Sequence, residues 1–297
     1  MRKIQFRLKR FAKLTISLGV FCFFCLRDTV RRLRGKPLPP QCVILYYHGI
    51  PPQQRKQFAR QMDALVRWAR PISAGRIAPL SIGQRYVAVT FDDAFESVLQ
   101  NALPELEKRT IPATIFVIAG LLGQTPGWEG YPGRTMTLEE LRKLPADLVT
   151  IGSHTMTHRS LLTLCEQEAM AELFESRVKL EELLRRKIRL FSFPFGAFQE
   201  EMVEWCRKAG YDRVFTTMPN AALTNPAEFV SGRVLVEPTD WPLEFYLKLL
   251  GSYRWLPWAY SAKQRFFPSR FNHEGVRDRT ILNRDSDSIG NKTAVVQ

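Results

Sequence analysis

YVAVTFDD, at residues 86–93, joins a short apolar run rich in β-branched residues to two adjacent carboxylates. The run predicts a buried strand, and Asp92 and Asp93 close it. An ionised carboxylate is costly to bury without a partner, so two in a row at a strand end require compensating groups. Because side chains alternate along a strand, the two carboxylates should point in different directions. One could then bind a cation while the other stays free to move a proton.

Similar apolar runs recur on both sides of this strand and alternate with segments of helical spacing. The alternation predicts parallel strands joined by helical crossovers, either as an open sheet or as a barrel. We expect strands at residues 43–47, 86–91, 113–119, 148–151, 188–193, 213–217 and 230–236, and helices at 53–70, 95–109, 162–186 and 199–209. Pro104 is a candidate kink in the helix at 95–109.

The composition suits one large α/β domain with peripheral segments, and the charge is strongly basic. The 297 residues include 43 Lys and Arg against 29 Asp and Glu, a formal net charge of +14. Nucleic acid, anionic lipid and acidic glycan are candidate partners for such a charge. The sequence contains no recognisable nucleic-acid motif, so we expect an anionic membrane surface and no nucleic acid. The five cysteines are odd in number and scattered, which predicts unpaired thiols.

Residues 1–36 predict a segment that associates with a membrane. An apolar run from Leu14 to Leu26 lies between two basic clusters. Its length of about 13 residues is short for a spanning helix, which needs about 20. No small-residue cleavage site follows it, which disfavours a signal peptide. A basic helix in the headgroup region, or a short uncleaved anchor, suits both flanks. We expect location at a bacterial inner membrane, on a side that the two basic flanks leave open.

The rest of the chain divides by composition. Residues 37–40, rich in proline, predict a linker, and residues 41–250 predict the folded domain. From Pro242 to Phe267 aromatic residues alternate with basic ones, which suits either a helix packed on the domain or a membrane interface. Residues 251–267 are therefore a candidate membrane-interface segment. Residues 268–297 are polar and patternless and are expected to be disordered.

Three of the four histidines lie at or just past the ends of predicted strands: His48, His154 and His158. His154 and His158 are spaced i, i+4, and a helical turn would place both on one face. Two imidazoles with one carboxylate form a common catalytic metal site that leaves a position open. Surface or capping histidines are the alternative. In parallel α/β folds the strand ends face one crevice, which would bring the histidines to Asp92 and Asp93.

Three motifs, in this order, resemble those of the polysaccharide deacetylases, the NodB-like carbohydrate esterases of family 4. They are TFDD at 90–93, HTMTH at 154–158 and FSFPFG at 191–196, and the resemblance covers about residues 41–250. It implies a distorted (β/α) barrel of about seven parallel strands. It also implies that Asp93, His154 and His158 bind a divalent metal ion, usually Zn²⁺. Asp92 would then be the general base that takes a proton from water on that ion.

The resemblance assigns further residues with less direct matches. Pro194 and Phe195 would shape the substrate groove, and the Phe195 backbone N–H would donate to the oxyanion. Many members carry an arginine where this chain has Ser192, and that arginine orients the base. Arg233, in the last expected strand, is a candidate replacement, and an exposed surface arginine is the alternative. Trp241, after Asp240, resembles a family aromatic residue that lines the acetyl pocket.

The general acid is the least direct of these assignments. The family's late Leu-x-x-His motif is absent, and the late histidine of this chain, His273, lies in the expected tail. His48 resembles the early histidine that takes the acid role in poly-N-acetylglucosamine deacetylases. A structural histidine is the alternative.

These residues predict a metal-dependent hydrolase that removes acetyl groups from N-acetylated amino sugars of a glycan or lipid-linked saccharide. Hydrolysis of O-acetyl esters by the same residues stays open, as does the oligomeric state. The alternative is a deacetylase-like glycan-binding protein that has lost catalysis, which Ser192 and the missing late motif suggest. The base and the three metal ligands favour the enzyme.

Overall fold

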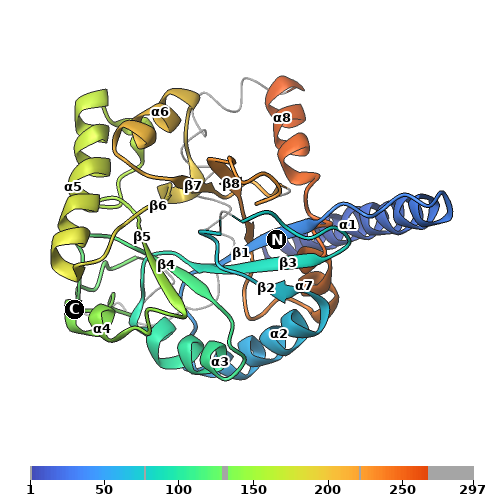
Figure 1. Cartoon of the computed structure of the whole chain (residues 1–297), viewed down its shortest axis with the longest axis horizontal. Coiled ribbons are helices and arrows are strands. Elements are labelled where there is room, and N and C mark those ends of the chain that lie inside the picture. The colour runs from blue at the N-terminus through green and yellow to red at the C-terminus, as the bar shows by residue number, and fades with distance from the viewer. Residues whose placement is uncertain (1, 77, 129–132, 221, 267–297) are drawn as a thin grey trace.

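A parallel sheet that curves into a barrel forms the centre of the molecule (Figure 1). The computed structural model describes residues 2–76, 78–128, 133–220 and 222–266. The strands run in the order β8-β7-β6-β5-β4-β3-β1-β9, and β2 pairs beside β3. Their bounds are β1 Gln41–Tyr47, β2 Arg70–Pro71, β3 Arg85–Phe91, β4 Ala113–Val117, β5 Val149–Ser153, β6 Leu190–Ser192, β7 Arg213–Thr216, β8 Val230–Gly232 and β9 Val234–Leu235.

The two ends of this sheet are joined by one short stretch of chain. β8 pairs with β7, and β9 pairs with β1, yet only Arg233 separates β8 from β9. The segment 230–235 therefore belongs to both edges, which makes the sheet barrel-like and excludes the open alternative. When β8 and β9 are counted as one strand and the two-residue β2 is set aside, the nine strands form a ring of seven. This agrees with the predicted barrel.

The strand register sets the positions of the polar residues. Tyr47, the last residue of β1, pairs with Phe91, the last residue of β3. The residues that follow, His48 and Asp92, therefore start level with one another, and the Asp92 N–H donates to the Tyr47 carbonyl at 2.9 Å. All strand pairs are parallel, so every carboxyl end lies at the same edge of the barrel.

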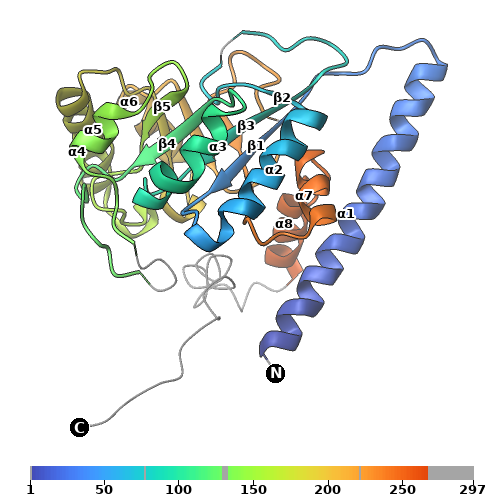
Figure 2. The same cartoon turned by 90° about the horizontal axis from the view of Figure 1, so that it is seen from below.

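Helices cover the outside of the barrel (Figures 1 and 2). The expected helix at 95–109 is instead a π-helical turn at Val98–Ala102 followed by α3. Pro104 in the first turn of α3 has no N–H to continue the preceding ladder, so the helix restarts there. The helices are α1 Arg2–Leu33, α2 Arg55–Trp68, α3 Leu103–Glu107, α4 Leu138–Lys143, α5 Glu166–Leu184, α6 Glu200–Lys208, α7 Pro242–Leu249 and α8 Leu256–Phe266.

The N-terminal segment is one helix, α1, that lies against the flank of the domain near α7 and extends beyond it (Figure 2). Ser17, which is buried, accepts a hydrogen bond from the Trp255 indole at 2.9 Å, and Arg10 pairs with Glu244 of α7 at 2.7 Å. Within the part of the chain that the structure describes, no helix combines the length and apolarity needed to cross a membrane. Membrane association of residues 1–36 stays a prediction.

The aromatic and basic segment after residue 241 is resolved in part. α7 packs on the domain, with Phe245, Leu247 and Leu249 buried, which favours the packing alternative for this helix. α8 lies within the candidate interface segment 251–267, and its Trp258 is 76% exposed. The expected tail at 268–297, with His273, lies outside the described residues.

Candidate active site

The predicted metal ligands meet at the carboxyl edge of the barrel. Asp93 follows β3, and His154 directly follows β5. One ligand atom each from Asp93, His154 and His158 lies within 4.8 Å of the others. The Asp93 Oδ1 atom is 3.5 Å from His154 Nε2 and 3.4 Å from His158 Nε2. The structure thus brings these three residues together.

The backbone that joins the two histidines is a loop and not the predicted helical turn. Thr155 and His158 both have left-handed φ angles, 68° and 62°, which non-glycine residues rarely adopt. Glu172 of α5 supports this conformation by accepting hydrogen bonds from the backbone N–H groups of Met156 at 2.8 Å and Thr157 at 2.9 Å, and also from the Thr157 hydroxyl. The two histidines do lie close together, as their i, i+4 spacing predicted, but the helical turn that this prediction assumed is wrong. Glu172 was missed because no local sequence pattern marks it.

Hydrogen bonding and burial make both imidazoles suitable metal ligands. His154 Nδ1 lies 2.7 Å from the Ser192 carbonyl oxygen, an acceptor, so Nδ1 carries the proton and the Nε2 lone pair faces Asp93. Burial lowers the pKa of His154, and burial together with the neighbouring His154 and His48 holds the pKa of His158 well below its ordinary value. Both rings are therefore neutral at pH 7.

Asp93 lacks the partners that its burial demands. Burial, with the adjacent Asp92 charge, raises the pKa of Asp93 well above its ordinary value, against the opposing effect of Arg233. Its buried Oδ1 atom has no hydrogen-bond partner among the described residues. A carboxylate oxygen thus faces two nitrogen lone pairs, an arrangement that a cation would stabilise.

The spacing also fits a small divalent ion. Ligand atoms about 2.0–2.1 Å from a tetrahedral Zn²⁺ lie about 3.3 Å apart, close to the two observed nitrogen–oxygen separations of 3.5 and 3.4 Å. The residues present therefore fit a metal ion.

Asp92 has the opposite environment to Asp93. The Arg233 guanidinium contacts both of its oxygens, with Nη1 to Oδ1 at 2.7 Å and Nη2 to Oδ2 at 2.8 Å. Burial alone would raise the pKa of Asp92, but the charges of Arg233 and His154 and the Arg233 hydrogen bonds lower it to about 2. The two adjacent aspartates are thus driven in opposite directions, which is the pattern expected when two carboxyls have different roles.

Arg233 is fully buried at 0% exposure, so the alternative of a surface arginine is wrong. It donates to the Ser192 hydroxyl at 2.7 Å and the Thr90 hydroxyl at 3.1 Å, and its guanidinium carbon lies 4.7 Å from the centre of the Tyr46 ring. Ser192 therefore contacts an arginine that comes from the closing segment of the barrel. The guanidinium is held from several sides and leaves Asp92 little freedom to rotate.

His48 lies in the same electrostatic environment as the other site residues. Its ring centre is 5.8 Å from that of Tyr46, and it interacts electrostatically with Asp92 and His154. Burial lowers the pKa of His48 to about 4, with the Asp92 charge opposing this shift and His154 adding to it. His48 is therefore neutral at pH 7 in the resting site.

Aromatic rings form a wall beside the histidines. The centre of the His158 ring lies 4.8 Å from that of Phe195 and 4.6 Å from that of Trp128. Phe195 occupies a left-handed conformation with φ 59°, in the 3₁₀ turn that begins at the buried Pro194. Trp128 was missed by sequence reasoning because it lies in a loop rich in glycine and proline, far from any motif.

The described ring contacts of Trp241 are with α1 and not with the residues of the candidate active site. Its ring is 5.2 Å from that of Phe11, and the Arg10 guanidinium lies 4.3 Å above it, both on α1. Asp240 pairs with Lys248 at 2.7 Å. These contacts place the Asp240-Trp241 pair at the junction of α1 and α7, and a role for Trp241 in an acetyl pocket stays a prediction.

Gly196 provides a test of how tightly this wall is built. A Cβ atom at this position would lie 2.0 Å from the Thr217 hydroxyl oxygen, and the φ of 63° is unfavourable for other residues. We expect Gly196→Ala to lower the free energy of unfolding by about 3 kcal/mol, measured by denaturant titration. Gly83→Ala is the matched control for a left-handed φ, 74°, with no neighbour within 4 Å of the added Cβ. Equal losses in the two variants would contradict the steric explanation.

Comparison with known proteins agrees with this site. Residues 81–214 match the polysaccharide deacetylase family model. The chain is 26% identical over 211 residues to YxkH of Bacillus subtilis, a polysaccharide deacetylase by name, covering 67% of this chain and 73% of that protein. It is 26% identical over 163 residues to a poly-beta-1,6-N-acetyl-D-glucosamine N-deacetylase of Staphylococcus aureus, covering 52% of this chain and only 55% of that protein.

A solved structure shows the same fold. IcaB from Ammonifex degensii superimposes with a TM-score of 0.61 at 29% identity, covering 71% of this chain and 98% of that one. The family-model match at residues 81–214 includes β3 and β5, which precede Asp92, Asp93 and His154, but it does not reach His48 or Arg233. The chain is therefore similar to polysaccharide deacetylases over residues 81–214, and its relatives include a protein named as an N-deacetylase.

Proposed function

We propose that the chain hydrolyses the acetamide of N-acetylated amino sugars in a glycan. The observation that carries this proposal is the divided environment of the adjacent aspartates. Asp92 is held ionised by Arg233, whereas Asp93 faces two neutral imidazoles without a hydrogen-bond partner on Oδ1 among the described residues. One carboxylate is thus suited to proton transfer and the other to metal binding.

Asp93, His154 and His158 would hold a divalent metal ion, and their donor set of two nitrogens and one oxygen suits Zn²⁺. When bound, the ion would polarise the acetyl carbonyl and lower the pKa of a water molecule. The neutral state of the two imidazoles means that neither must lose a proton first. Asp93 must be ionised, so the affinity for the metal should rise with pH.

Asp92 would take the proton from the attacking water. The two contacts with Arg233 fix the carboxylate plane, and a pKa of about 2 keeps it ionised at neutral pH. A base this weak does not retain the proton, which favours its transfer onward to the leaving nitrogen. The water oxygen would become one oxygen of acetate. The proton that Asp92 takes would pass on to the leaving nitrogen as the C–N bond breaks, and the other water proton would be released when the acetic acid product ionises.

His48 would deliver the proton to the leaving nitrogen. Its pKa of about 4 means that it begins neutral and must gain a proton during the reaction, and its interaction with Asp92 supports transfer between them. The rings of Phe195 and Trp128 beside His158 would face the apolar methyl group or the sugar ring. The relative named for poly-beta-1,6-N-acetyl-D-glucosamine supports a β-1,6-linked N-acetylglucosamine chain as the first substrate to test.

The primary experiment measures acetate release from β-1,6-linked N-acetylglucosamine oligomers by the purified chain with Zn²⁺. We expect release by the wild type and a loss of about 10²–10⁴-fold in kcat with Asp92→Asn, which keeps the shape but removes the base. If the chain binds these oligomers but releases no acetate, the glycan-binding alternative is favoured. If kcat/KM is higher for O-acetylated sugars than for N-acetylated ones, the chain is primarily an esterase.

The role of His48 is tested by comparing substrates with different leaving groups. His48→Ala should lower kcat for the amide substrate by about 10²-fold or more, because the leaving amine needs a proton. An aryl acetate ester, whose phenolate leaves without protonation, should lose much less. His273→Ala, at the late histidine of the chain, is the control and should keep both rates. Equal losses on amide and aryl ester would assign His48 a structural role.

A further inference from the structure

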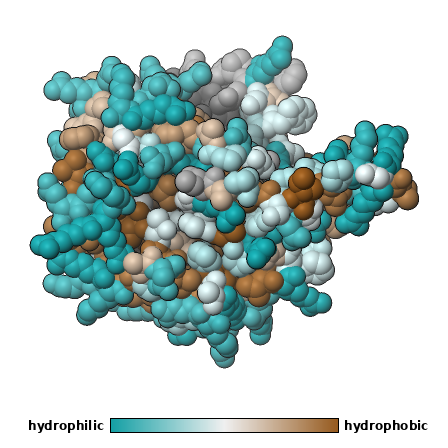
Figure 3. Space-filling model, in the orientation of Figure 1, coloured by the Kyte–Doolittle hydropathy of each residue, from teal (hydrophilic) through white to brown (hydrophobic). Residues whose placement is uncertain are grey.

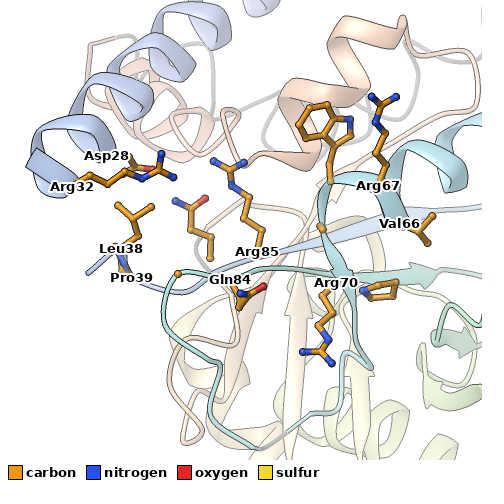
Figure 4. A pocket seen from close by; sticks show the side chains of 14 residues that line it. Asp28, Arg32, Leu38, Pro39, Val66, Arg67, Arg70, Gln84 and Arg85 are labelled. Atoms are coloured by element: carbon orange, nitrogen blue, oxygen red, sulfur yellow. The ribbon is translucent and has the colours of Figure 1, made fainter. Parts of the chain in front are cut away.

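A second hollow lies at the end of the barrel opposite to Asp92, where β1 and β3 begin. This cavity of about 550 Å³ opens between α1, the end of α2 and the strands β2 and β3 (Figure 4). Four arginines line it: Arg32, Arg67, Arg70 and Arg85. In Figure 4, Arg32 extends from α1 and Arg85 from the start of β3 into the space between the helix and the domain.

The positive charge in this arginine pocket is not balanced by the protein. Across the described ranges, no ion pair joins any of the four arginines to a carboxylate. The one carboxylate in the lining, Asp28, is already paired with Arg27 at 2.7 Å. Arginines from four separate elements, α1, α2, β2 and β3, therefore line a hollow with an excess of hydrogen-bond donors, which suits the binding of a phosphate group.

The border of the pocket is apolar. Val66 and Trp68 line the pocket and are exposed. Leu33 and Ile82, which are adjacent in sequence to lining residues, are 83% and 66% exposed. A pocket that combines unpaired arginines with an exposed aliphatic and aromatic border matches the boundary between lipid headgroups and acyl chains. A soluble anion would gain nothing from this border.

The outer face of α1 favours a bilayer over a second protein copy. It exposes a row of large apolar side chains between basic clusters at residues 7–13 and 27–36. Two copies of α1 packed through this row would bring basic clusters together in either the parallel or the antiparallel direction. Anionic lipid would neutralise both clusters, and Figure 3 shows hydrophilic and hydrophobic residues side by side on the protruding end of α1. The exposed row comprises Phe11, Ile16, Leu18, Phe23 and Leu26.

We propose that the arginine pocket binds the phosphate of an anionic phospholipid headgroup at a membrane surface, with its apolar border in the interface. The pocket lies where the strands begin, and Asp92 lies where they end, so the headgroup site and the active site are at opposite ends of the barrel.

The test is sedimentation of the full chain with vesicles of phosphatidylcholine alone or with 30% phosphatidylglycerol. Arg32→Gln combined with Arg85→Gln should weaken binding to the anionic vesicles by roughly 10- to 30-fold, about the effect of two basic residues near such a surface. Arg60→Gln with Lys108→Gln removes the same charge at exposed positions outside the pocket and should have a much smaller effect. If both double variants lose the same binding to anionic vesicles, the arginine pocket is not the lipid site.

Two further measurements separate lipid phosphate from a soluble phosphate and locate the contact. Calorimetric titration with inorganic phosphate should show binding at least 10-fold weaker than binding to the anionic vesicles. Tight binding of inorganic phosphate, lost in the pocket variant while vesicle binding persists, would overturn the lipid assignment. Vesicles with brominated acyl chains should quench tryptophan fluorescence in the wild type and less in Trp68→Phe. If quenching is the same in Trp68→Phe and wild type, the border of the arginine pocket does not contact the lipid. Circular dichroism checks that each variant folds, and none of these readouts depends on catalysis.

Discussion

Arg233→Met is expected to lower the free energy of unfolding at pH 7 by about 3–5 kcal/mol and to lower kcat/KM for deacetylation by about 10²-fold or more. The substitution removes both contacts to Asp92 and leaves a buried carboxylate without a partner. It also leaves the Ser192 hydroxyl without the donor that now lies 2.7 Å away. Methionine keeps most of the side-chain volume, so the loss reports charge and hydrogen bonding more than a cavity.

The substitution should also change how stability and kcat/KM depend on pH. In the wild type the pKa of Asp92 is about 2, below the ordinary value near 3.9. The stabilisation from its ionised form is therefore complete above about pH 4 and is lost as the pH falls through about 2. Without Arg233, burial and Asp93 would raise the pKa of Asp92. We therefore expect the acid limb of kcat/KM to move to higher pH, and the gain in stability between pH 2 and 4 to disappear.

Two matched variants distinguish orientation of the base from general damage. Arg213 is also buried in the barrel, but it donates to backbone carbonyls of residues 74, 76 and 228 and not to Asp92. Arg213→Met should lower stability and leave the acid limb in place. Arg233→Lys keeps the charge without the two-point contact and should recover part of the stability. An acid limb that is the same in Arg233→Met and wild type would contradict the proposed positioning role.

Asp93→Asn is expected to stabilise the metal-free protein while abolishing metal binding. The raised pKa of Asp93 means that this group contributes stability only below the unfolded value near 3.9, and loses that contribution as the pH rises through its folded value. Ionisation of Asp93 places its charge beside the Asp92 charge and two lone pairs, and asparagine avoids this unfavourable interaction. Neutral asparagine should raise the free energy of unfolding in chelator by about 1–3 kcal/mol.

Without metal we expect Asp93→Asn to be the more stable protein, and with Zn²⁺ we expect the wild type to be the more stable. Zn²⁺ at 100 times its dissociation constant would stabilise the wild type by about 2.7 kcal/mol and leave Asp93→Asn unchanged. Asp147→Asn, at an exposed carboxylate, is the control and should match the wild type in both conditions. The measurement is thermal unfolding with chelator and with Zn²⁺, followed by acetate release. Destabilisation of Asp93→Asn in chelator, or retention of the metal-induced rise in Tm, would contradict the metal site.

Local sequence patterns predicted the elements well where burial imposes a period. The apolar runs at 86–91 and 213–217 correspond to β3 and β7, and the apolar spacing at 199–209 corresponds to α6. The helix expected at 95–109, with a kink at Pro104, is present, but the irregularity is a π-helical turn at 98–102 before the proline, which the sequence pattern did not predict. Two-residue strands such as β2 are too short to produce any period.

Local sequence pattern was enough to identify the residues at the strand ends, because a strand's apolar run stops where polar residues begin. It thereby located both aspartates and His154, but it left an open sheet and a barrel as alternatives, and only the resemblance to a family favoured the barrel. The surroundings of each aspartate follow from the tertiary structure alone. Arg233 lies 141 residues from Asp92 and reaches it because the segment between β8 and β9 closes the barrel. Likewise Glu172 bends the histidine loop from a separate helix. Such pairings follow from how the sheet closes, and no local spacing encodes that closure.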